Sequence, residues 1–467
     1  MTTELGTEQR PLRVAIVGAG PSGFYAADAL FRSPLVITVD AFDKLATPYG
    51  LLRGGVAPDH QKMKSVSSYY ERVATKFPER FRFIGNVLIG KDITVDELRT
   101  YYDAIVFSYG SSSDQKTGLP GEELPGVYSA REFVGWYNGH PDYQHFEFDL
   151  NQEVVAIIGQ GNVAIDVARI LAKTPEELST SDITQKALDA LSASKVKEIH
   201  IIGRRGPVQS AFTELEAKEL GELHDATVVV YEKDLVLDEP NQREMNEVES
   251  NKSRKNYAVL QELAQKPKDG KSKKVFIQYF KYPKEITGTT RAESLKMDVV
   301  RLEGEAFKQR AVPTGEEFSV PAGLIFRSIG YKGTSLPGVP FDSKKGIIPN
   351  EKGRVTDHGN VVSGFYTAGW IKRGPSGVLG SNKPCSTETI DCLLEDLPTL
   401  PACSIPSTEA LFELLTSRGV RTVSFQDWKL IDQREVELGQ AKGKPREKFT
   451  TQAEFFQTLD VVVKKER

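Results

Sequence analysis

The sequence predicts an α/β fold made of two Rossmann-like dinucleotide-binding domains, with the second domain inserted into the first. Two observations support this prediction. A strand, a glycine-rich turn and a helix follow one another twice, and the two turns begin at Gly18 and Gly159. A further strand with a glycine turn, over residues 364–370, comes late in the chain, where it can complete the first domain after the second has ended.

The first copy begins with the apolar run Leu12–Val17, which is typical of a buried parallel strand. The turn G-A-G-P-S-G occupies residues 18–23, a helix is expected over residues 24–31, and a second strand over residues 36–42 ends at Asp43. An acid in that place can accept hydrogen bonds from ribose hydroxyls. We therefore expect a pyrophosphate at the helix N-terminus. The alternative is a glycine turn in a domain that binds no nucleotide.

The second copy has its turn, G-Q-G-N-V-A, at residues 159–164, with a helix expected over residues 165–172. Its next strand, Glu198–Ile202, is followed by Arg204 and Arg205 rather than by an acid. Guanidinium groups form charge-assisted hydrogen bonds with phosphates, so this pair predicts a site that selects NADPH over NADH. The alternative is a pair of solvated surface arginines.

Two nucleotide sites in one chain indicate FAD in the first and NADPH in the second. Loops rich in proline and glycine at residues 118–126 and 328–339 mark two crossings between domains. We predict an FAD-binding domain over residues 10–112 and 338–467, and an NADPH-binding domain over residues 113–337.

The remaining segments carry weaker patterns. Residues 233–274 are highly charged, and we expect loops and a surface helix there, with its apolar part at residues 257–263. Late in the chain, amphipathic helices are expected near residues 409–415 and 453–462. The polar stretch between them, residues 432–448, is expected to wrap over the surface.

Composition excludes several classes of protein. A net charge of -4 argues against a nucleic-acid binder. The three cysteines form no Cys-x-x-Cys pair, which argues against a disulfide reductase and fits a reducing compartment. The six histidines lack ligand spacing, so no metal site is predicted. No apolar run reaches the roughly 18–20 residues of a transmembrane segment.

A bound flavin can accept a hydride and release electrons singly, so no protein nucleophile is required. Other readings remain open at this point. One is a flavin monooxygenase or oxidase, which no sequence feature supports. Another is a disulfide reductase, and the absence of a cysteine pair argues against it. The last is a redox-sensing module that holds FAD and NADPH without turnover.

Seven blocks, in order and nearly end to end, resemble the adrenodoxin reductase family. They are VGAGPSGFY (17–25), PYGLLRGGVAPDH (48–60), SAREFVGWYNG (129–139), GQGNVAIDVAR (159–169), GRRGP (203–207), GWIKRGPSG (369–377) and GKPREK (443–448). The resemblance implies the two-domain plan of the disulfide-reductase-like flavoproteins. It also implies an oxidoreductase that takes hydride from NADPH onto FAD and passes single electrons to a [2Fe–2S] ferredoxin, in cytochrome P450 or iron–sulfur cluster and heme pathways.

The resemblance further implies which residues contact the cofactors. FAD contacts are expected at Gly18, Gly20, Ser22, Gly23, Asp43, Leu51, Val87, Trp370, Gly377, Val378 and Leu379. NADPH contacts are expected at Gln160, Gly161, Asn162, Val163, Arg204, Arg205, Glu216 and Gly377. His60 and Trp370 are expected beside the flavin in the catalytic site. The alternatives are a structural histidine in a turn and a core tryptophan.

The expected partner is an acidic, adrenodoxin-like [2Fe–2S] ferredoxin that docks at Arg254 and Lys255, within a basic run of the NADPH-binding domain. A solvated charged face is the alternative. The resemblance also implies a monomer in the mitochondrial matrix, peripheral to the inner membrane. The location rests on the resemblance alone, because residues 1–10 contain two glutamates and no targeting pattern.

Overall fold

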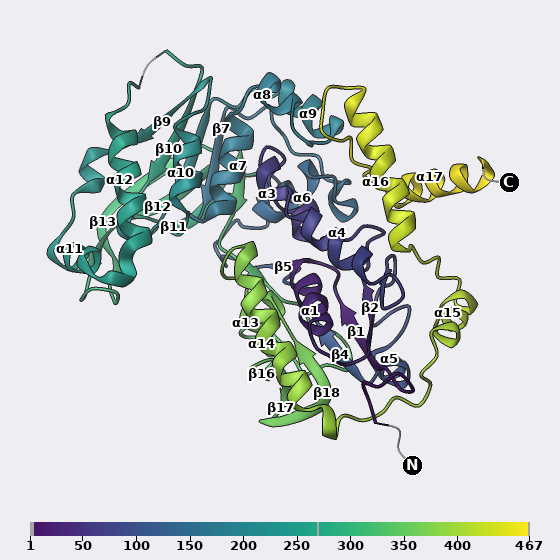
Figure 1. Cartoon of the computed structure of the whole chain (residues 1–467). Helices are drawn as coiled ribbons and strands as arrows, with labels where there is room; N and C mark the ends of the chain where they lie inside the picture. The colour runs from purple at the N-terminus through teal and green to yellow at the C-terminus, as the bar shows by residue number, and fades with distance from the viewer. Residues whose placement is uncertain (1–3, 269, 466–467) are drawn as a thin grey trace.

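The computed structural model describes residues 4–268 and 270–465 of the chain. It has two α/β lobes, each built around its own sheet (Figure 1). The middle of the chain forms the second lobe, at the upper left of the view, and the two ends of the chain share the first. None of the described helices combines the length and the apolarity needed to cross a membrane.

The first lobe contains a seven-stranded sheet in the order β16-β17-β18-β4-β1-β2-β3. Its central strands are parallel, and the late strand β18 pairs with β4, so the end of the chain completes the sheet as predicted. The strands are β1 (Leu12–Val17), β2 (Ile37–Phe42), β3 (Phe81–Ile84), β4 (Ala104–Phe107), β16 (Asn350–Glu351), β17 (Arg354–Asp357) and β18 (Asn360–Thr367).

The second lobe contains a six-stranded parallel sheet in the order β6-β14-β7-β8-β10-β9. These strands are β6 (Val127–Ser129), β7 (Val154–Ile158), β8 (Glu198–Ile202), β9 (Ala226–Val230), β10 (Lys273–Gln278) and β14 (Leu324–Arg327). An antiparallel sheet of β11 (Lys281–Thr287), β12 (Ser294–Glu303) and β13 (Arg310–Val320) adjoins it. The predicted fold class, two Rossmann-like α/β domains with one inserted into the other, is confirmed.

The two chain segments that connect the lobes form strands that pair with each other. The short strand β5 (Ser113–Asp114) runs antiparallel to β15 (Tyr331–Lys332). Both strands lie between the two large sheets in sequence, so the chain leaves the first lobe and returns to it at one place. We keep residues 10–112 with 338–467, and residues 113–337, as the proposed domain division.

Helices cover both faces of the first sheet, whereas in the second lobe helices cover one face of the large sheet and β11–β13 pack on the other. Those in the first lobe are α1 (Pro21–Phe31), α2 (Leu51–Gly54), α3 (Gln61–Lys64), α4 (Ser67–Lys76), α5 (Val95–Tyr101), α13 (Trp370–Arg373), α14 (Asn382–Glu395), α15 (Thr408–Ser417), α16 (Phe425–Gln440) and α17 (Gln452–Lys465). Those in the second are α6 (Ala130–Tyr137), α7 (Asn162–Ala172), α8 (Pro175–Ser179), α9 (Gln185–Ser192), α10 (Glu214–Leu220), α11 (Glu239–Asn246) and α12 (Asn251–Gln265).

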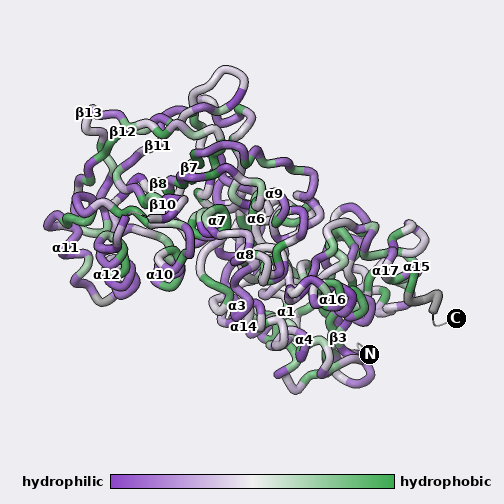
Figure 2. Tube along the Cα trace, turned by 90° about the horizontal axis from the view of Figure 1, so that it is seen from above, coloured by the Kyte–Doolittle hydropathy of each residue, from purple (hydrophilic) through white to green (hydrophobic). Residues whose placement is uncertain are grey.

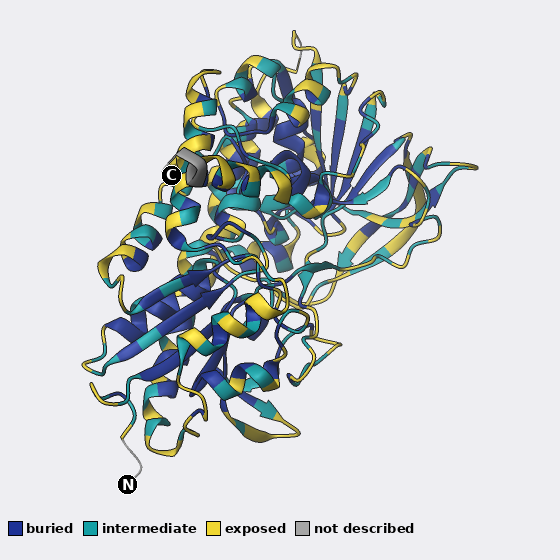
Figure 3. Cartoon of the chain, turned by 90° about the vertical axis from the view of Figure 1, so that its right-hand side faces the viewer, coloured by how far each residue is buried: buried dark blue, intermediate teal, exposed yellow. Residues whose placement is uncertain are grey.

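Burial follows the periodicity of each element. All six residues of β1 are buried, since helices lie on both faces of its sheet. Leu12, Val14 and Ile16 pack with α1 on one face, whereas Ala15 and Val17 pack on the other. The strands of the two large sheets are accordingly mostly dark in Figure 3, whereas β11–β13 and the outer helices and loops carry many intermediate and exposed residues. In Figure 2 the outer helix α12 carries both polar and apolar stretches, as a helix at a core surface should.

The prediction that residues 432–448 wrap over the surface is wrong. Helix α16 continues to Gln440, and Glu435 on it is 0% exposed. Both oxygens of Glu435 accept hydrogen bonds from Arg53, at 2.8 and 2.6 Å. A polar pattern usually marks a solvated face, but here it marks charged groups that are buried because they are paired. The charged segment 233–274 likewise ends in strand β10, which the sequence pattern did not reveal.

We expect Glu435→Gln to lower the free energy of unfolding by about 3–5 kcal/mol, because it leaves the Arg53 guanidinium without its anionic partner. The matched control is Glu437→Gln on the same helix, whose carboxylate makes only exposed contacts, with Arg434 and Gln433, and which should change stability by less than ~0.5 kcal/mol. Urea denaturation of both variants measures the difference. Equal losses would show that the buried pair contributes nothing special to stability.

Candidate cofactor sites

The glycine turn after β1 combines two closely packed positions with a less crowded one. Gly18 has φ +107°, and a Cβ there would lie 2.6 Å from the Tyr109 Cα atom. A Cβ on Gly23 would lie 2.3 Å from the Gly18 carbonyl oxygen. Gly20 differs, because the nearest atom to a Cβ there is 3.8 Å away. The turn is therefore tight where helix meets strand and less crowded at the N-terminus of α1, where the backbone amides can bind a pyrophosphate.

Asp43 lies at the end of β2, beside this turn. Its carboxylate accepts hydrogen bonds from the backbone N–H groups of Ala19 and Leu45, both at 3.0 Å. Burial raises the pKa of the Asp43 carboxyl to about 6, against the two backbone hydrogen bonds, which lower it. Further donors would stabilise the charged carboxylate. The hydroxyls of an adenosine ribose would supply such donors, so the residues present fit a dinucleotide such as FAD.

The other residues expected near the flavin differ in exposure. Leu51 and Val378 are 42% and 62% exposed, which is high for large apolar side chains and leaves them available to an apolar ring. Leu379 packs against the core of the first lobe. Val87 is 1% exposed and belongs to that lobe's core, so its side chain is shielded from any ligand. Its N–H group donates to the Asp43 carbonyl.

The segment after β18 approaches the first turn from the other side. A Cβ on Gly369 would lie 2.1 Å from the Ser22 Oγ atom, so the two segments are in direct contact. Trp370 follows, half-buried, with its ring 5.7 Å from that of Tyr331 in the crossing strand β15. Gly377 has φ +82°, and a Cβ there would lie 2.3 Å from the Ser381 Oγ atom. This segment therefore lies between the first turn and the second lobe.

The turn of the second lobe repeats this construction. A Cβ on Gly159 would lie 2.1 Å from the Ser328 carbonyl oxygen, whereas one on Gly161 would meet nothing within 4 Å. Polar side chains brace the turn: the Gln160 side-chain amide donates to the Gln278 carbonyl at 2.9 Å, and Asn162 accepts from the Thr213 N–H group at 2.8 Å. The next residue, Val163, packs against the core. The position at Gly161, next to the N-terminus of α7, is therefore open.

Arg204 and Arg205 follow β8 and are exposed. The Arg204 guanidinium carbon lies 6.0 Å from the centre of the Tyr282 ring, which is itself 41% exposed. Within the part of the chain that the structure describes, neither arginine forms an ion pair with a carboxylate. Both positive charges are therefore available to a phosphate dianion.

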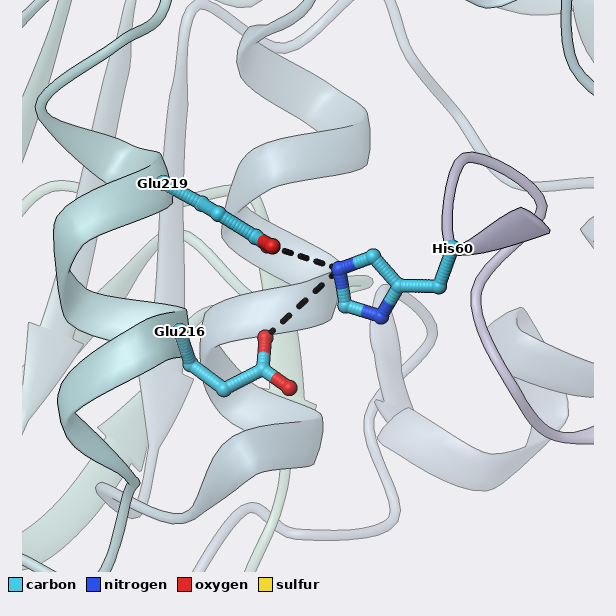
Figure 4. A group of neighbouring side chains, drawn as sticks. All are labelled: His60, Glu216 and Glu219. Carbon is cyan, nitrogen blue, oxygen red and sulfur yellow. Dashed lines mark hydrogen bonds and ion pairs between the residues drawn. The ribbon is translucent and has the colours of Figure 1, made fainter. Parts of the chain in front are cut away.

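His60 joins the two lobes (Figure 4). It precedes α3 in the first lobe, and its Nε2 atom lies 2.6 Å from Glu219 and 3.8 Å from Glu216, both on α10 of the second lobe. Burial lowers the pKa of His60, but the hydrogen bond to Glu219 and nearby carboxylates outweigh burial and raise it above its ordinary value. The His60 imidazole therefore connects its own lobe to the second lobe.

A buried arginine completes this cluster. Arg169 on α7 is 1% exposed, and its guanidinium lies 2.8 Å from Asp59, 2.7 Å from Asp166 and 3.1 Å from Glu216. The sequence predicts Glu216 as an NADPH contact, but the carboxylate here is turned toward Arg169. Sequence reasoning did not single out Arg169 or Glu219. The block at residues 159–169 contained the arginine, but its partners come from distant segments.

Three ligand atoms of His60, Glu216 and Glu219 lie within 4.8 Å of one another, a spacing that could hold a metal ion. The Arg169 guanidinium, however, contacts both glutamates, at 3.1 and 3.4 Å. A cation therefore already neutralises the carboxylates that a metal would need. We assign the cluster to ion pairing across the lobes.

Arg254 and Lys255, the expected docking residues, lie on α12 of the second lobe. The Arg254 guanidinium is half-buried and donates to the carbonyl oxygens of Met245 and Glu247, at 2.7 and 2.5 Å. Lys255 is exposed, and its Nζ atom lies 3.6 Å from Glu214. The Arg254 guanidinium thus hydrogen-bonds the turn at the end of α11, and the ammonium group of Lys255 is the more accessible of the two charges.

Burial raises the pKa of Glu216 to about 7, helped by the nearby charge of Asp166. A raised pKa in the folded state stabilises the fold below the ordinary pKa, and this contribution is lost as the pH rises through the folded value. We expect the stability of the wild type relative to Glu216→Gln to fall by about 1–3 kcal/mol between pH 5 and pH 8. Urea denaturation at several pH values measures this.

The control for this experiment is Glu214→Gln, at a partly exposed position on the same helix that pairs with Lys218. Its stability difference from the wild type should stay flat over the same pH range. A flat difference for Glu216→Gln as well would contradict the raised pKa.

Comparisons with known proteins agree with this geometry. Residues 12–229 match the family model described as pyridine nucleotide-disulphide oxidoreductase. The chain is 43% identical to the human NADPH:adrenodoxin oxidoreductase, mitochondrial, over 97% of this chain and 93% of that protein. It is 40% identical to the NADPH-ferredoxin reductase FprA of Mycobacterium tuberculosis, over 95% and 98%.

The structure of Mycobacterium tuberculosis FprA in complex with NADPH matches with a TM-score of 0.89 at 37% identity, covering 96% of this chain and 99% of that one. Identity of this level over nearly the full length of both proteins establishes common descent. The chain belongs to the adrenodoxin reductase family, together with the NADPH:adrenodoxin oxidoreductases and FprA.

Proposed function

We propose that this protein is an NADPH:ferredoxin oxidoreductase of the adrenodoxin type, which takes hydride from NADPH onto FAD and passes single electrons to a ferredoxin. One observation carries the proposal. Two glycine turns, each at a helix N-terminus, lie in one chain, and the first is followed by Asp43 and the second by Arg204 and Arg205, so the two sites suit different nucleotides. The names of the human and mycobacterial relatives support the same reaction.

In this proposal the first lobe holds FAD and the second holds NADPH. FAD is bound by Gly18, Gly20, Ser22, Gly23, Asp43, Leu51, Trp370, Gly377, Val378 and Leu379, and by the backbone of Val87. NADPH is bound by Gln160, Gly161, Asn162, Val163, Arg204, Arg205, Glu216 and Gly377. When bound, the flavin accepts a hydride as an electron pair and releases electrons one at a time.

In this proposal the residues of the chain bind and orient the two cofactors and shield them from water. Asp43 accepts hydrogen bonds from ribose, and the N-termini of α1 and α7 stabilise the two pyrophosphates. Trp370 and Tyr331 limit access of water at the crossing between the lobes. The His60–Glu219 pair holds α10 of the second lobe against the first, at 2.6 Å.

The proposed electron acceptor is an acidic [2Fe–2S] ferredoxin that docks on the second lobe at Arg254 and Lys255. The exposed charge of Lys255 supports this assignment, whereas the guanidinium of Arg254 supports it less directly, through the turn it stabilises. Opposite charge would chiefly raise the rate of encounter and make it sensitive to salt. We further propose a monomer, peripheral to the inner mitochondrial membrane on its matrix side, since the mouse and human relatives are named as mitochondrial.

The experiment that tests the function is an anaerobic titration of the FAD-reconstituted protein with NADPH, followed by addition of a [2Fe–2S] ferredoxin. The yellow absorbance should bleach with NADPH and return as the ferredoxin is reduced. Cytochrome c should then be reduced only when ferredoxin is present. Protein that folds but retains no flavin, or whose NADPH-reduced flavin leaves ferredoxin oxidised and, once air is admitted, produces hydrogen peroxide instead, would overturn the proposal.

Replacing both Arg204 and Arg205 with alanine should make the free energy of NADPH binding less favourable by about 3–6 kcal/mol, because each charge-assisted hydrogen bond contributes ~1.5–3 kcal/mol. Binding of NADH, which lacks the 2′-phosphate, should change little. The dissociation constants of both nucleotides, measured by calorimetry, give the comparison. Arg243→Ala removes an exposed arginine of the same lobe and should leave both unchanged. Equal losses for NADPH and NADH would rule out a 2′-phosphate contact.

A further inference from the structure

The segment at residues 444–448 follows α16 and lies between the two lobes. In Figure 1 the chain beyond α16 passes beside α9 of the second lobe before it returns to α17. Two of its lysines are buried, with Lys444 4% and Lys448 3% exposed. Lysine is almost never buried without a partner, so the contacts of these two side chains show what the segment holds.

Lys448 reaches both lobes from this position. Its Nζ atom lies 3.2 Å from Asp182 and 3.1 Å from the Asn138 side-chain oxygen, both in the second lobe. The same atom donates to the Arg53 carbonyl oxygen of the first lobe, at 3.4 Å. A second cation from the first lobe, Lys64, meets the other oxygen of Asp182 at 2.6 Å. One buried carboxylate of the second lobe is thus held by two ammonium groups.

Lys444 and Glu447 extend the contact toward α9. The Lys444 Nζ atom donates to the Ile183 carbonyl oxygen at 2.6 Å and to Glu447 at 2.6 Å. The other oxygen of Glu447 accepts from the Gln185 N–H group at 2.9 Å, at the start of α9. Side chains of the segment therefore satisfy backbone groups of the second lobe that would otherwise be unpaired.

The segment is anchored to the first lobe through Glu435. The Phe449 N–H group donates to the Glu435 carboxylate at 2.9 Å, and Arg446 lies 3.3 Å from it. The same carboxylate holds Arg53 of α2, at 2.6 Å. Arg53 lies two residues after Leu51 on α2, and Leu51 is one of the residues proposed above to contact the flavin. Polar contacts thus link Glu435 to the Arg53 side chain, the Arg53 carbonyl to Lys448, and Lys448 to Asp182.

We propose that residues 444–448 form an interlobe clasp, whose Lys448–Asp182–Lys64 triad fixes the second lobe against the first in the orientation required for hydride transfer. The inference rests on the proposed function for the reaction it serves. Lys448 and Asp182 act here as positioning residues: they lie in the joint and act through the lobes they hold.

The proposal depends on the strict geometry that buried charged groups require. Buried ion pairs are favourable only when their geometry and remaining hydrogen bonds are satisfied, so each disfavours other lobe orientations. Hydride transfer is sensitive to such orientation, and a misplacement of about 1 Å far from the chemistry can slow a reaction about 100-fold. Loss of the clasp should therefore affect the step that crosses the lobes more than binding within either lobe.

The test uses the full-length protein with Lys448→Met and Asp182→Asn. The matched control is Lys197→Met, which breaks an exposed pair with Glu153 inside the second lobe. The first readout is hydrogen exchange of the amides at residues 182–185 in protein without nucleotide. The second is the rate of flavin reduction at saturating NADPH, compared with the affinity for NADPH and the affinity for FAD.

The clasp predicts at least tenfold faster exchange at residues 182–185 and at least tenfold slower flavin reduction in both variants, with both affinities within about twofold of wild type. Lys448→Arg should recover part of the rate, and the control should match the wild type. Unchanged exchange, or an unchanged reduction rate, would overturn the proposal, as would an equal loss in cofactor affinity.

Asn138→Ala removes only one acceptor of Lys448 and serves if the charge variants do not fold. It should give smaller changes in the same direction, and wild-type values in both readouts would overturn the clasp. Failure of the proposed function is separate, since it would appear as wild-type protein that NADPH does not reduce, while the exchange experiment requires no turnover.

Discussion

Buried ion pairs across the joint between the two lobes are the interaction on which the rest of the structure depends. Each lobe has its own sheet, core and glycine turn, but a reaction between two bound nucleotides needs both turns at a fixed separation. His60 with Glu219, and Asp59 with Arg169, join the lobes on one side of the joint. Charged contacts of this kind specify one arrangement, whereas apolar surfaces can slide past one another.

The two lobes use the same backbone solution with different side chains around it. In each turn, one glycine is required by the close approach of a neighbouring segment, and another lies with more room around it at a helix N-terminus. What distinguishes the sites is the residue that follows the next strand, an acid in one lobe and arginines in the other. A fold shared by two sites therefore acquires different chemistry from a few side chains at one edge of each sheet.

Much of the fold could be predicted from the sequence, because local patterns determine it. The apolar run and the glycines that follow it predict strand β1, its turn and helix α1. The late strand β18 predicts the inserted arrangement. The polar joint could not be predicted, since Glu435, Lys448 and Asp182 are far apart in sequence and look like solvated charges. Arg169 was similarly hidden, as its partners Asp59 and Glu219 lie on other segments. Pairing of buried charges is a property of tertiary structure alone.

The pairing of β4 with β18 has a consequence for synthesis on the ribosome. Strand β4 ends at Phe107 and its neighbour begins at Asn360, so the entire inserted lobe emerges before that edge of the first sheet can be covered. An unpaired strand edge is a template for association with other chains. The middle lobe can complete its own sheet first, while the nascent amino-terminal half waits with an open edge. Newly made chains of this architecture should therefore be most vulnerable to aggregation midway through translation.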